Sequence, residues 1–277
     1  MEFYLERLPI PELADVVRTV WIQTTGEVSY LQRHLPTGGV EIHWPVGGQP
    51  RLLGPLTGPR LEAVPARSTI LGVRFRPGAA PLAATALDEL VDQGVALGDL
   101  WGMSVQRLAE AMAAEETPLR ALGLLQTHLV RRFRTSVSSD PLVGEAVQVL
   151  MPWHPATVGR VAGHLGLSVS QLRRRSLHAL GITPKGLQRT LRFQAFLALA
   201  QAGAAASGRR GSDGIAGLAV DVGYADQAHL SRDCLRLTGL TPTRLLGGDV
   251  ERCACGHEHA ASYQPFLATR SKYRLLA

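Results

Sequence analysis

The stretch DVGYADQAHLSRDCLRLTG, at residues 221–239, carries residue types that hydrolytic enzymes use. Asp226, His229 and Cys234 follow one another closely, with Ser231 between them. An acid, an imidazole and a nucleophile can form a catalytic triad when the fold brings them together. The same residues can instead form one face of a helix that contacts a larger partner. A second copy of the pattern would favour the helix, because a triad needs unlike residues that converge rather than a duplicated scaffold.

A second group of chemically active residues lies near the C-terminus. Cys253, Cys255, His257 and His259 alternate with other residues, so an extended chain would project all four on one side. Such a set can chelate Zn(II) or Cu(I), although structural zinc sites usually separate paired cysteines by about two to four residues and the spacing here is one. We favour a flexible tail that binds metal weakly, with a metal-responsive sensor as the alternative function.

A third group, His34, Glu41 and His43, falls on neighbouring predicted strands and is compatible with a cupin-like metal site. Three such residues are more often ordinary surface polar groups. The sequence therefore predicts no metal ligand, no cofactor and no catalytic residue.

Composition limits the possible classes of protein. The chain has 277 residues, of which 45% are hydrophobic and 5% aromatic, which predicts about two domains with cores of Leu, Val and Ala. No apolar run reaches the ~18 residues that span a bilayer, and no basic segment precedes an apolar one at the N-terminus. We expect no membrane partner and no secretion signal. Three cysteines make no disulfide framework, so a reducing, cytoplasmic location is expected.

Charge differs between the two halves. Residues 1–139 hold 13 arginines against 14 acidic residues, whereas residues 140–249 hold 12 basic against 7 acidic residues. The formal net charge of +6 therefore lies in the second half. This asymmetry predicts a polyanionic partner for that half, although a solvated basic surface is the simpler alternative.

The hydrophobic pattern changes along the chain. Alternation in GGVEIHWP and the turn signals PTGG, VGGQP and GPLTGP predict short strands in the first 76 residues, and helices follow from residue 80. The fold class is therefore an α+β N-terminal domain, a small β-sheet followed by helices, plus an all-α C-terminal domain with two helix-turn-helix units. The predicted boundaries are residues 1–135 for the first domain, 136–141 for a linker, 142–247 for the second domain and 248–277 for an irregular tail.

Two features of the first domain have alternative uses. The apolar stripe at 118–134 is a candidate dimerisation helix, although a place in the domain core is the simpler interpretation. Trp44, Phe75 and Trp101 can line a small-molecule pocket, but core packing explains them equally well.

The second domain contains an internal repeat. GRVAGHLGLSVSQLRRR at 159–175 matches AGLAVDVGYADQAHLSRD at 216–233. Each copy is an apolar helix, a turn opened by Gly166 or Gly223, and a second helix capped by Ser168 or Asp226. This arrangement is a helix-turn-helix, found twice. Two copies in one basic segment are hard to obtain by chance, so the repeat predicts binding to double-stranded DNA in successive major grooves about 34 Å apart. The segment 185–200 is the helix between the units.

Residues 142–247 resemble the DNA-binding domain of AraC/XylS-type transcription regulators. IAGLAVDVGYADQAHLSRDCLRLTGLTPTRLL is similar to the C-terminal signature of that family, and LGLSVSQLRRRSLHALGITP is a looser match. The family usually has an aromatic residue at the positions of Ser176 and Cys234, and often Phe at that of Leu230. Residues 1–135 are similar, through HLPTGGVEIHW, GVRFRPGAA and LGDLWG, to a sensor-like domain of an uncharacterised subset.

The resemblance implies which residues contact DNA. The predicted set is Ser170, Gln171, Arg173 and Arg174 on the first recognition helix, and Gln227, Ala228, Ser231 and Arg232 on the second. Leu172 and Val169 are expected to face inward, and Arg175 to meet phosphate or solvent. Asp226 is expected to cap its helix, and His229 to be partly buried or to face phosphate.

These features predict a sequence-specific DNA-binding transcription regulator of the AraC type that is not an enzyme. Its N-terminal domain would respond to a small-molecule effector or pair two chains as a homodimer. An alternative is an enzyme in residues 1–135 with a DNA-binding appendage, as in self-modifying repair proteins. That alternative needs a reactive nucleophile, and this half contains no cysteine.

Overall fold

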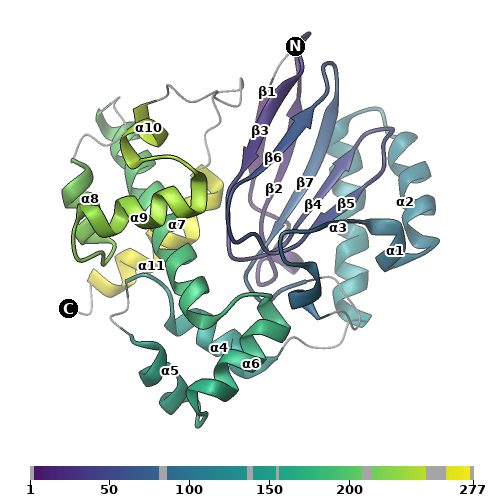
Figure 1. Ribbon diagram of the computed structural model, residues 1–277. Coiled ribbons are helices and arrows are strands. Elements are labelled where there is room, and N and C mark those ends of the chain that lie inside the picture. The colour runs from purple at the N-terminus through teal and green to yellow at the C-terminus, as the bar shows by residue number, and fades with distance from the viewer. Residues whose placement is uncertain are drawn as a thin grey trace.

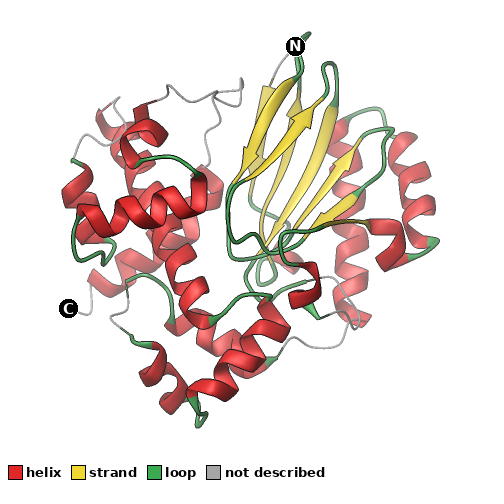
Figure 2. Cartoon of the chain, viewed as in Figure 1, coloured by secondary structure: helices red, strands yellow, loops and turns green. Residues whose placement is uncertain are grey.

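A β-rich half and a helical half lie side by side in the computed structural model (Figure 1). The structure describes residues 3–80, 86–135, 140–153, 156–207, 214–247 and 260–274. Within them the strands are confined to the N-terminal half, and the C-terminal half is helical (Figure 2). The predicted fold class, α+β followed by all-α, is confirmed.

The strands form two antiparallel sheets. They are β1 (Phe3–Arg7), β2 (Val17–Thr24), β3 (Tyr30–His34), β4 (Glu41–Pro45), β5 (Arg51–Leu53), β6 (Arg60–Val64), β7 (Thr69–Phe75) and β8 (Gly94–Ala96). The larger sheet has the order β1-β2-β7-β4-β5-β8, and β3 pairs with β6 in the smaller one.

The two faces of the larger sheet have different chemistry because side chains alternate along each strand. Ile42, Val73 and Phe75 lie in an apolar core on one face. On the other face Trp21 covers Gly72, where an added Cβ would lie 1.8 Å from the indole ring. That second face also carries polar groups, among them His43, and contacts across it reach the smaller sheet.

Helices cover the apolar face. The short helices η1 (Pro11–Leu13) and η2 (Leu87–Leu90) precede α1 (Leu97–Trp101), α2 (Ser104–Ala113) and α3 (Pro118–Thr135). Leu122, Leu125 and Leu129 of α3 are buried in the same core as Phe75 and Trp101. The apolar stripe of α3 therefore serves the core, and Trp44, Phe75 and Trp101 are core residues as well.

The C-terminal half is built around one long helix. Its helices are α4 (Pro141–Val149), α5 (Val158–His164), α6 (Val169–Leu180), α7 (Pro184–Ser207), α8 (Ile215–Asp221), α9 (Gln227–Thr238) and α10 (Pro242–Gly247). Buried Leu187, Leu191, Phe193 and Phe196 of α7 belong to a single core that includes residues of α5, α6, α8 and α9. The predicted role of 185–200, to lie between the two units and pack against both, is confirmed.

The prediction of an irregular tail was wrong for residues 260–274, which form α11 (Ala260–Arg274). This helix packs against α7 and against strands β1 and β2 (Figure 1). Phe266 is buried, and its carbonyl accepts a hydrogen bond from Trp153 Nε1 at 2.9 Å. Pro265 lies inside the helix and removes one backbone hydrogen-bond donor, which disfavours a helix at this place. Packing against the rest of the protein therefore stabilises α11.

Candidate nucleic-acid interface

The first helix-turn-helix unit consists of α5, a turn and α6. Gly166 opens the turn with φ 65°, a backbone conformation that residues with a Cβ adopt only at a cost. Ser168 then caps α6 through two reciprocal hydrogen bonds. The Gln171 backbone N–H donates to Ser168 Oγ at 3.1 Å, and the Ser168 backbone N–H donates to Gln171 Oε1 at 2.8 Å. This is a capping box, which fixes where the helix begins.

The second unit, α8 and α9, repeats this plan with different side chains. Gly223 opens the turn with φ 83°. Asp226 caps α9 by accepting a hydrogen bond from the His229 backbone N–H at 2.6 Å, as the sequence predicted. Both second helices end at a left-handed glycine, Gly181 with φ 70° and Gly239 with φ 73°. The repeat seen in the sequence is therefore a repeat of the structure.

The inward faces of α6 and α9 each pack a leucine and a smaller side chain into the core. Leu172 and Ser176 are buried on α6, and Leu230 and Cys234 are buried on α9. Val169 was expected to join them, but its side chain is 51% exposed. It is the first residue of α6, where the helix has just left the turn.

The residues that suggested a catalytic triad are used otherwise. The Asp226 carboxylate caps α9, and the His229 ring packs edge-on against Tyr224 with 5.0 Å between centroids. His229 is half-buried, as expected. Burial raises the pKa of Cys234 to about 11, which keeps the thiol protonated and unreactive. These residues therefore cap helix α9 and pack it against its neighbours.

The predicted DNA-contacting residues lie away from the core. On α6, Ser170, Gln171, Arg173 and Arg174 are exposed, and on α9 Gln227, Ala228 and Arg232 are exposed while Ser231 is half-buried. No described residue forms an ion pair with Arg173, Arg174 or Arg232. Gln171 differs from the others, because its side-chain oxygen accepts a hydrogen bond in the capping box, which restrains the side chain at the start of α6.

Arg175 is partly exposed, but its guanidinium also forms an ion pair that the sequence did not predict. Its Nε and Nη2 atoms donate to the Asp140 carboxylate at 2.8 and 3.1 Å. Asp140 also caps α4, so the pair ties α6 to the start of that helix. Burial alone would raise the pKa of Asp140, but the hydrogen bonds from Arg175 and from two backbone N–H groups lower it overall.

The N-terminal half contacts both second helices at their C-terminal ends. Gly181 of α6 lies so close to Leu87 that an added Cβ would be 2.6 Å from the Leu87 carbonyl oxygen. Near the end of α9, Arg33 Nη1 donates to the Thr238 carbonyl at 2.9 Å, next to Gly239. Equivalent positions of the two units are therefore held by the same domain, and the predicted DNA-contacting residues lie nearer the opposite ends.

A helix-turn-helix domain model matches residues 161–247, which begin within α5 and include the rest of both units. The C-terminal half of this chain therefore contains a helix-turn-helix domain. A domain of unknown function, DUF6597, matches residues 5–96 and accompanies it at the N-terminal side.

Solved structures similar to the whole chain share little sequence with it. ToxT from Vibrio cholerae O395 is 11% identical with a TM-score of 0.45, covering 88% of this chain and 97% of ToxT. ToxT from the same strain bound to (E)-4-(8-methylnaphthalen-1-yl)but-3-enoic acid is 11% identical with a TM-score of 0.46, covering 88% and 98%. ToxT of strain SCE256 bound to an unsaturated fatty acid is 13% identical with a TM-score of 0.44, covering 88% and 94%. No curated protein matches the sequence.

Two further expectations concern features outside the helix-turn-helix units. Cys253, Cys255, His257 and His259 lie outside the described residues. Among the described helices, none combines the length and apolarity that a bilayer-spanning segment requires.

The N-terminal polar residues are not surface groups, contrary to expectation. His34, Glu41 and His43 lie on the polar face of the larger sheet and on the strand that covers it, and none of them is exposed. Burial lowers the pKa of His43, which favours the neutral imidazole. Glu62 of β6, which the sequence did not single out, lies 3.3 Å from His34 and 3.9 Å from His43. The pairing of β3 with β6 places Glu62 beside the two histidines, and no local sequence pattern predicts that pairing.

Proposed function

We propose that this protein is a sequence-specific DNA-binding transcription regulator whose helices α6 and α9 read the major groove. The observation that carries the proposal is a repeated scaffold in which both second helices present the predicted contact residues away from the core, all of them exposed except the half-buried Ser231. A helix-turn-helix places residues near the start of its second helix against base edges. A net positive charge in this half favours the phosphate backbone.

The two helices have different capacities for reading sequence. On α6, Arg173 and Arg174 can each form a two-pronged contact to guanine, worth roughly 1–3 kcal/mol of discrimination. On α9, Ala228 offers only an apolar contact, for example to a thymine methyl, and Arg232 is the one exposed cation among the predicted contacts. We therefore propose that α6 specifies more of the site and α9 mainly adds affinity.

We propose further that the N-terminal half regulates DNA binding through an effector or through pairing of two chains. The support is its contact with the C-terminal ends of both recognition helices, at Gly181 and Gly239. A domain that holds both ends can favour or oppose the helix arrangement that fits DNA. Any ligand that binds one arrangement more tightly shifts the balance by that difference in affinity.

The test is selection of bound fragments from random DNA by the full chain. The expected product is a two-part site whose halves are centred about one helical turn apart, with the stronger base preference in one half. Selection should be repeated after Arg174→Ala, with Arg7→Ala in the N-terminal half as a matched loss of one exposed cation. Recovery of random sequences, or of a single undivided site, would contradict the proposal that both α6 and α9 contact the major groove.

A further inference from the structure

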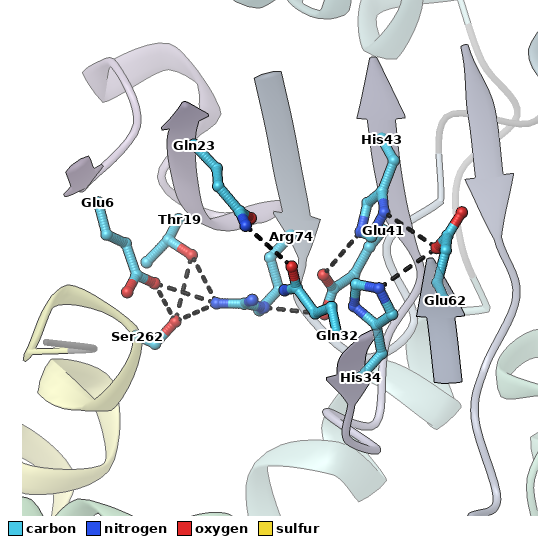
Figure 3. Close-up of polar contacts among 10 residues, drawn as sticks. All are labelled: Glu6, Thr19, Gln23, Gln32, His34, Glu41, His43, Glu62, Arg74 and Ser262. Carbon is cyan, nitrogen blue, oxygen red and sulfur yellow. Dashed lines mark hydrogen bonds and ion pairs between the residues drawn. The ribbon is translucent and has the colours of Figure 1, made fainter. Parts of the chain in front are cut away.

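The N-terminal half contains a group of three metal-ligating side chains that the DNA-binding role does not use. We call it the inter-sheet cluster, and it consists of His34 of β3, His43 of β4 and Glu62 of β6 (Figure 3). One nitrogen of each imidazole and one carboxylate oxygen all lie within 4.8 Å of one another. The residues come from both sheets, so the fold rather than local sequence assembles them.

The distances are close to those of a four-coordinate metal site. His34 Nε2 lies 3.3 Å from Glu62 Oε2, and His43 Nδ1 lies 3.9 Å from the same oxygen. Ligand atoms about 2.0–2.2 Å from zinc in a tetrahedron are roughly 3.3–3.6 Å apart. One separation already fits, and the others need a shift of about an ångström or less. Two imidazoles and one carboxylate are a ligand set typical of Zn²⁺.

Two of the three ligand atoms are buried and meet in an ion pair. His34 Nε2 and Glu62 Oε2 lie 3.3 Å apart, and neither atom makes a well-formed hydrogen bond to a described residue. A metal ion between them would coordinate both atoms together.

Neighbouring groups fix the third ligand. Glu41 Oε2 lies 3.5 Å from His43 Nε2, which leaves His43 Nδ1 facing Glu62. Trp21 meets the His43 ring edge-on at 5.1 Å between centroids. A carboxylate behind a histidine is the arrangement that orients metal-binding imidazoles in proteins. Arg74 Nε in turn donates to Glu41 at 2.8 Å, so the carboxylate is itself held.

The cluster is accessible on one side. The side chain of Glu62 is 30% exposed, whereas those of His34 and His43 are 11% and 8% exposed. An ion can therefore approach past Glu62, and water can supply a fourth ligand from the same side. Zinc sites with three protein ligands are known to hold water in the fourth position.

From this geometry we propose that His34, His43 and Glu62 bind a divalent transition-metal ion of the zinc type, and that this ion is the effector of the protein. The binding site stands on the cluster alone. The effector role rests on the proposed function, and it deepens that function by naming the class of ligand that the N-terminal half senses.

A chain of contacts leads from the cluster to the helix-turn-helix domain. Behind His43, Glu41 pairs with Arg74, which also hydrogen-bonds Ser262 of α11 (Figure 3). The Ser262 carbonyl accepts a hydrogen bond from Arg18 Nε at 2.7 Å. Metal coordination by His43 would therefore act on a polar network that reaches the helix packed against α7.

The network also reaches α7 directly. Arg18 Nη2 donates to Gln194 Oε1 of α7 at 3.0 Å, and Arg18 is buried. Because α7 packs against both helix-turn-helix units, a shift of this contact changes the support of α6 and α9 together. Coupling between the sites is then carried by a continuous set of hydrogen bonds and ion pairs.

The first experiment measures metal binding by the full chain. The tail ligands are removed by Cys253→Ser, Cys255→Ser, His257→Ala and His259→Ala, so that they cannot compete. Titration with Zn²⁺, and with Co²⁺ for its visible absorption, is expected to give one tightly bound ion per chain. Glu62→Gln and, separately, His43→Ala should each weaken binding about a hundredfold or more.

Two controls keep the result interpretable. His164→Ala removes an exposed histidine of α5 and should leave the affinity for Zn²⁺ unchanged. Circular dichroism should show that Glu62→Gln, the milder change, is folded. Loss of all tight binding in the tail variant, or unchanged binding after Glu62→Gln and His43→Ala, would overturn the proposed site.

The second experiment measures DNA affinity with Zn²⁺ and with a chelator. The expected result is a change of about tenfold in Kd that disappears in Glu62→Gln. An ion that binds at the cluster and leaves DNA affinity unchanged would overturn the effector role. A chain that binds Zn²⁺ but no DNA under either condition would contradict the proposed function and leave the metal site standing.

Discussion

The two helix-turn-helix units share a scaffold and differ in how each is held. In the first, a capping box begins α6, and Gly181 at its end is pressed against the backbone of Leu87. In the second, one carboxylate begins α9, and Gly239 at its end meets the flexible side chain of Arg33. The first unit is therefore more firmly fixed at both ends. Both units have the turn glycine and the buried helix positions, and they differ by one residue in turn length, in the caps and in what the N-terminal half touches.

Ion pairs show the same contrast. Arg175 of the first unit pairs with Asp140, which caps α4. In the second unit Asp233 pairs with Arg189 of α7 at 3.1 Å. Thus α6 is anchored to the start of the domain, whereas α9 is anchored to the helix shared by both units. A disturbance of α7 is expected to affect α9 more directly than α6.

The largest expected effect is a loss of stability when the glycine that ends α6 is replaced, compared with the glycine that ends α9. Gly181→Ala should lower the free energy of unfolding by about 3 kcal/mol or more, since a Cβ meets the Leu87 carbonyl and positive φ disfavours alanine. Gly239→Ala should cost about 1 kcal/mol, because the Arg33 side chain can move. Urea denaturation of both variants measures the difference. Equal losses of unfolding free energy in the two variants would show that the contact of Gly181 with Leu87 does not add to the cost of an alanine at positive φ.

The next comparison concerns the DNA-facing arginines. Arg174→Ala should relax base preference at one position of the bound site, a loss of roughly 1–3 kcal/mol of discrimination. Arg232→Ala should mainly weaken binding and flatten its dependence on salt. Affinities for single-base variants of the selected site, measured at several salt concentrations, distinguish the two. A uniform loss across all sequences would assign Arg174 to phosphate instead.

Changes at the two helix caps should have smaller effects. Ser168→Ala and Asp226→Ala are each expected to cost about 1 kcal/mol of stability, because each removes one hydrogen bond from a backbone N–H to the capping side chain. Thermal or urea unfolding provides the measurement. An unchanged stability in either variant would contradict the role of that residue as a cap.

The smallest effect is expected at the ion pair of the first unit. Arg175→Ala should cost less than about 1 kcal/mol, because the arginine side chain is 40% exposed and the pair is screened by solvent. The pKa of Asp140 is lowered in the folded chain, so the contribution of its carboxylate is present near neutral pH and is lost as the pH falls through the lowered pKa. The variant should therefore lose part of the acid sensitivity of unfolding, and a gain would contradict the pairing.

Local patterns made the helix-turn-helix units predictable. The turn glycines, the caps at Ser168 and Asp226 and the buried Leu172 and Leu230 all lie within one short segment each, where spacing reports structure. The stripe of α3 was interpretable for the same reason.

Features that depend on distant contacts were not predictable. Arg175 meets Asp140 across 35 residues, and Glu62 reaches His34 only through the pairing of β3 with β6. The helix α11 contains Pro265 and is stabilised by docking, so its own sequence gives little sign of it. Burial of His43 likewise follows from the second sheet, which covers a face that alternation alone assigns to solvent.

Contact of one domain with the ends of both recognition helices has a consequence for the operator. The distance between the recognition helices α6 and α9 then depends on the whole chain rather than on residues 142–247 alone. An isolated C-terminal half is expected to accept half-sites at several separations. The intact protein, in which Leu87 and Arg33 contact the ends of the two helices, is expected to bind half-sites at one separation only.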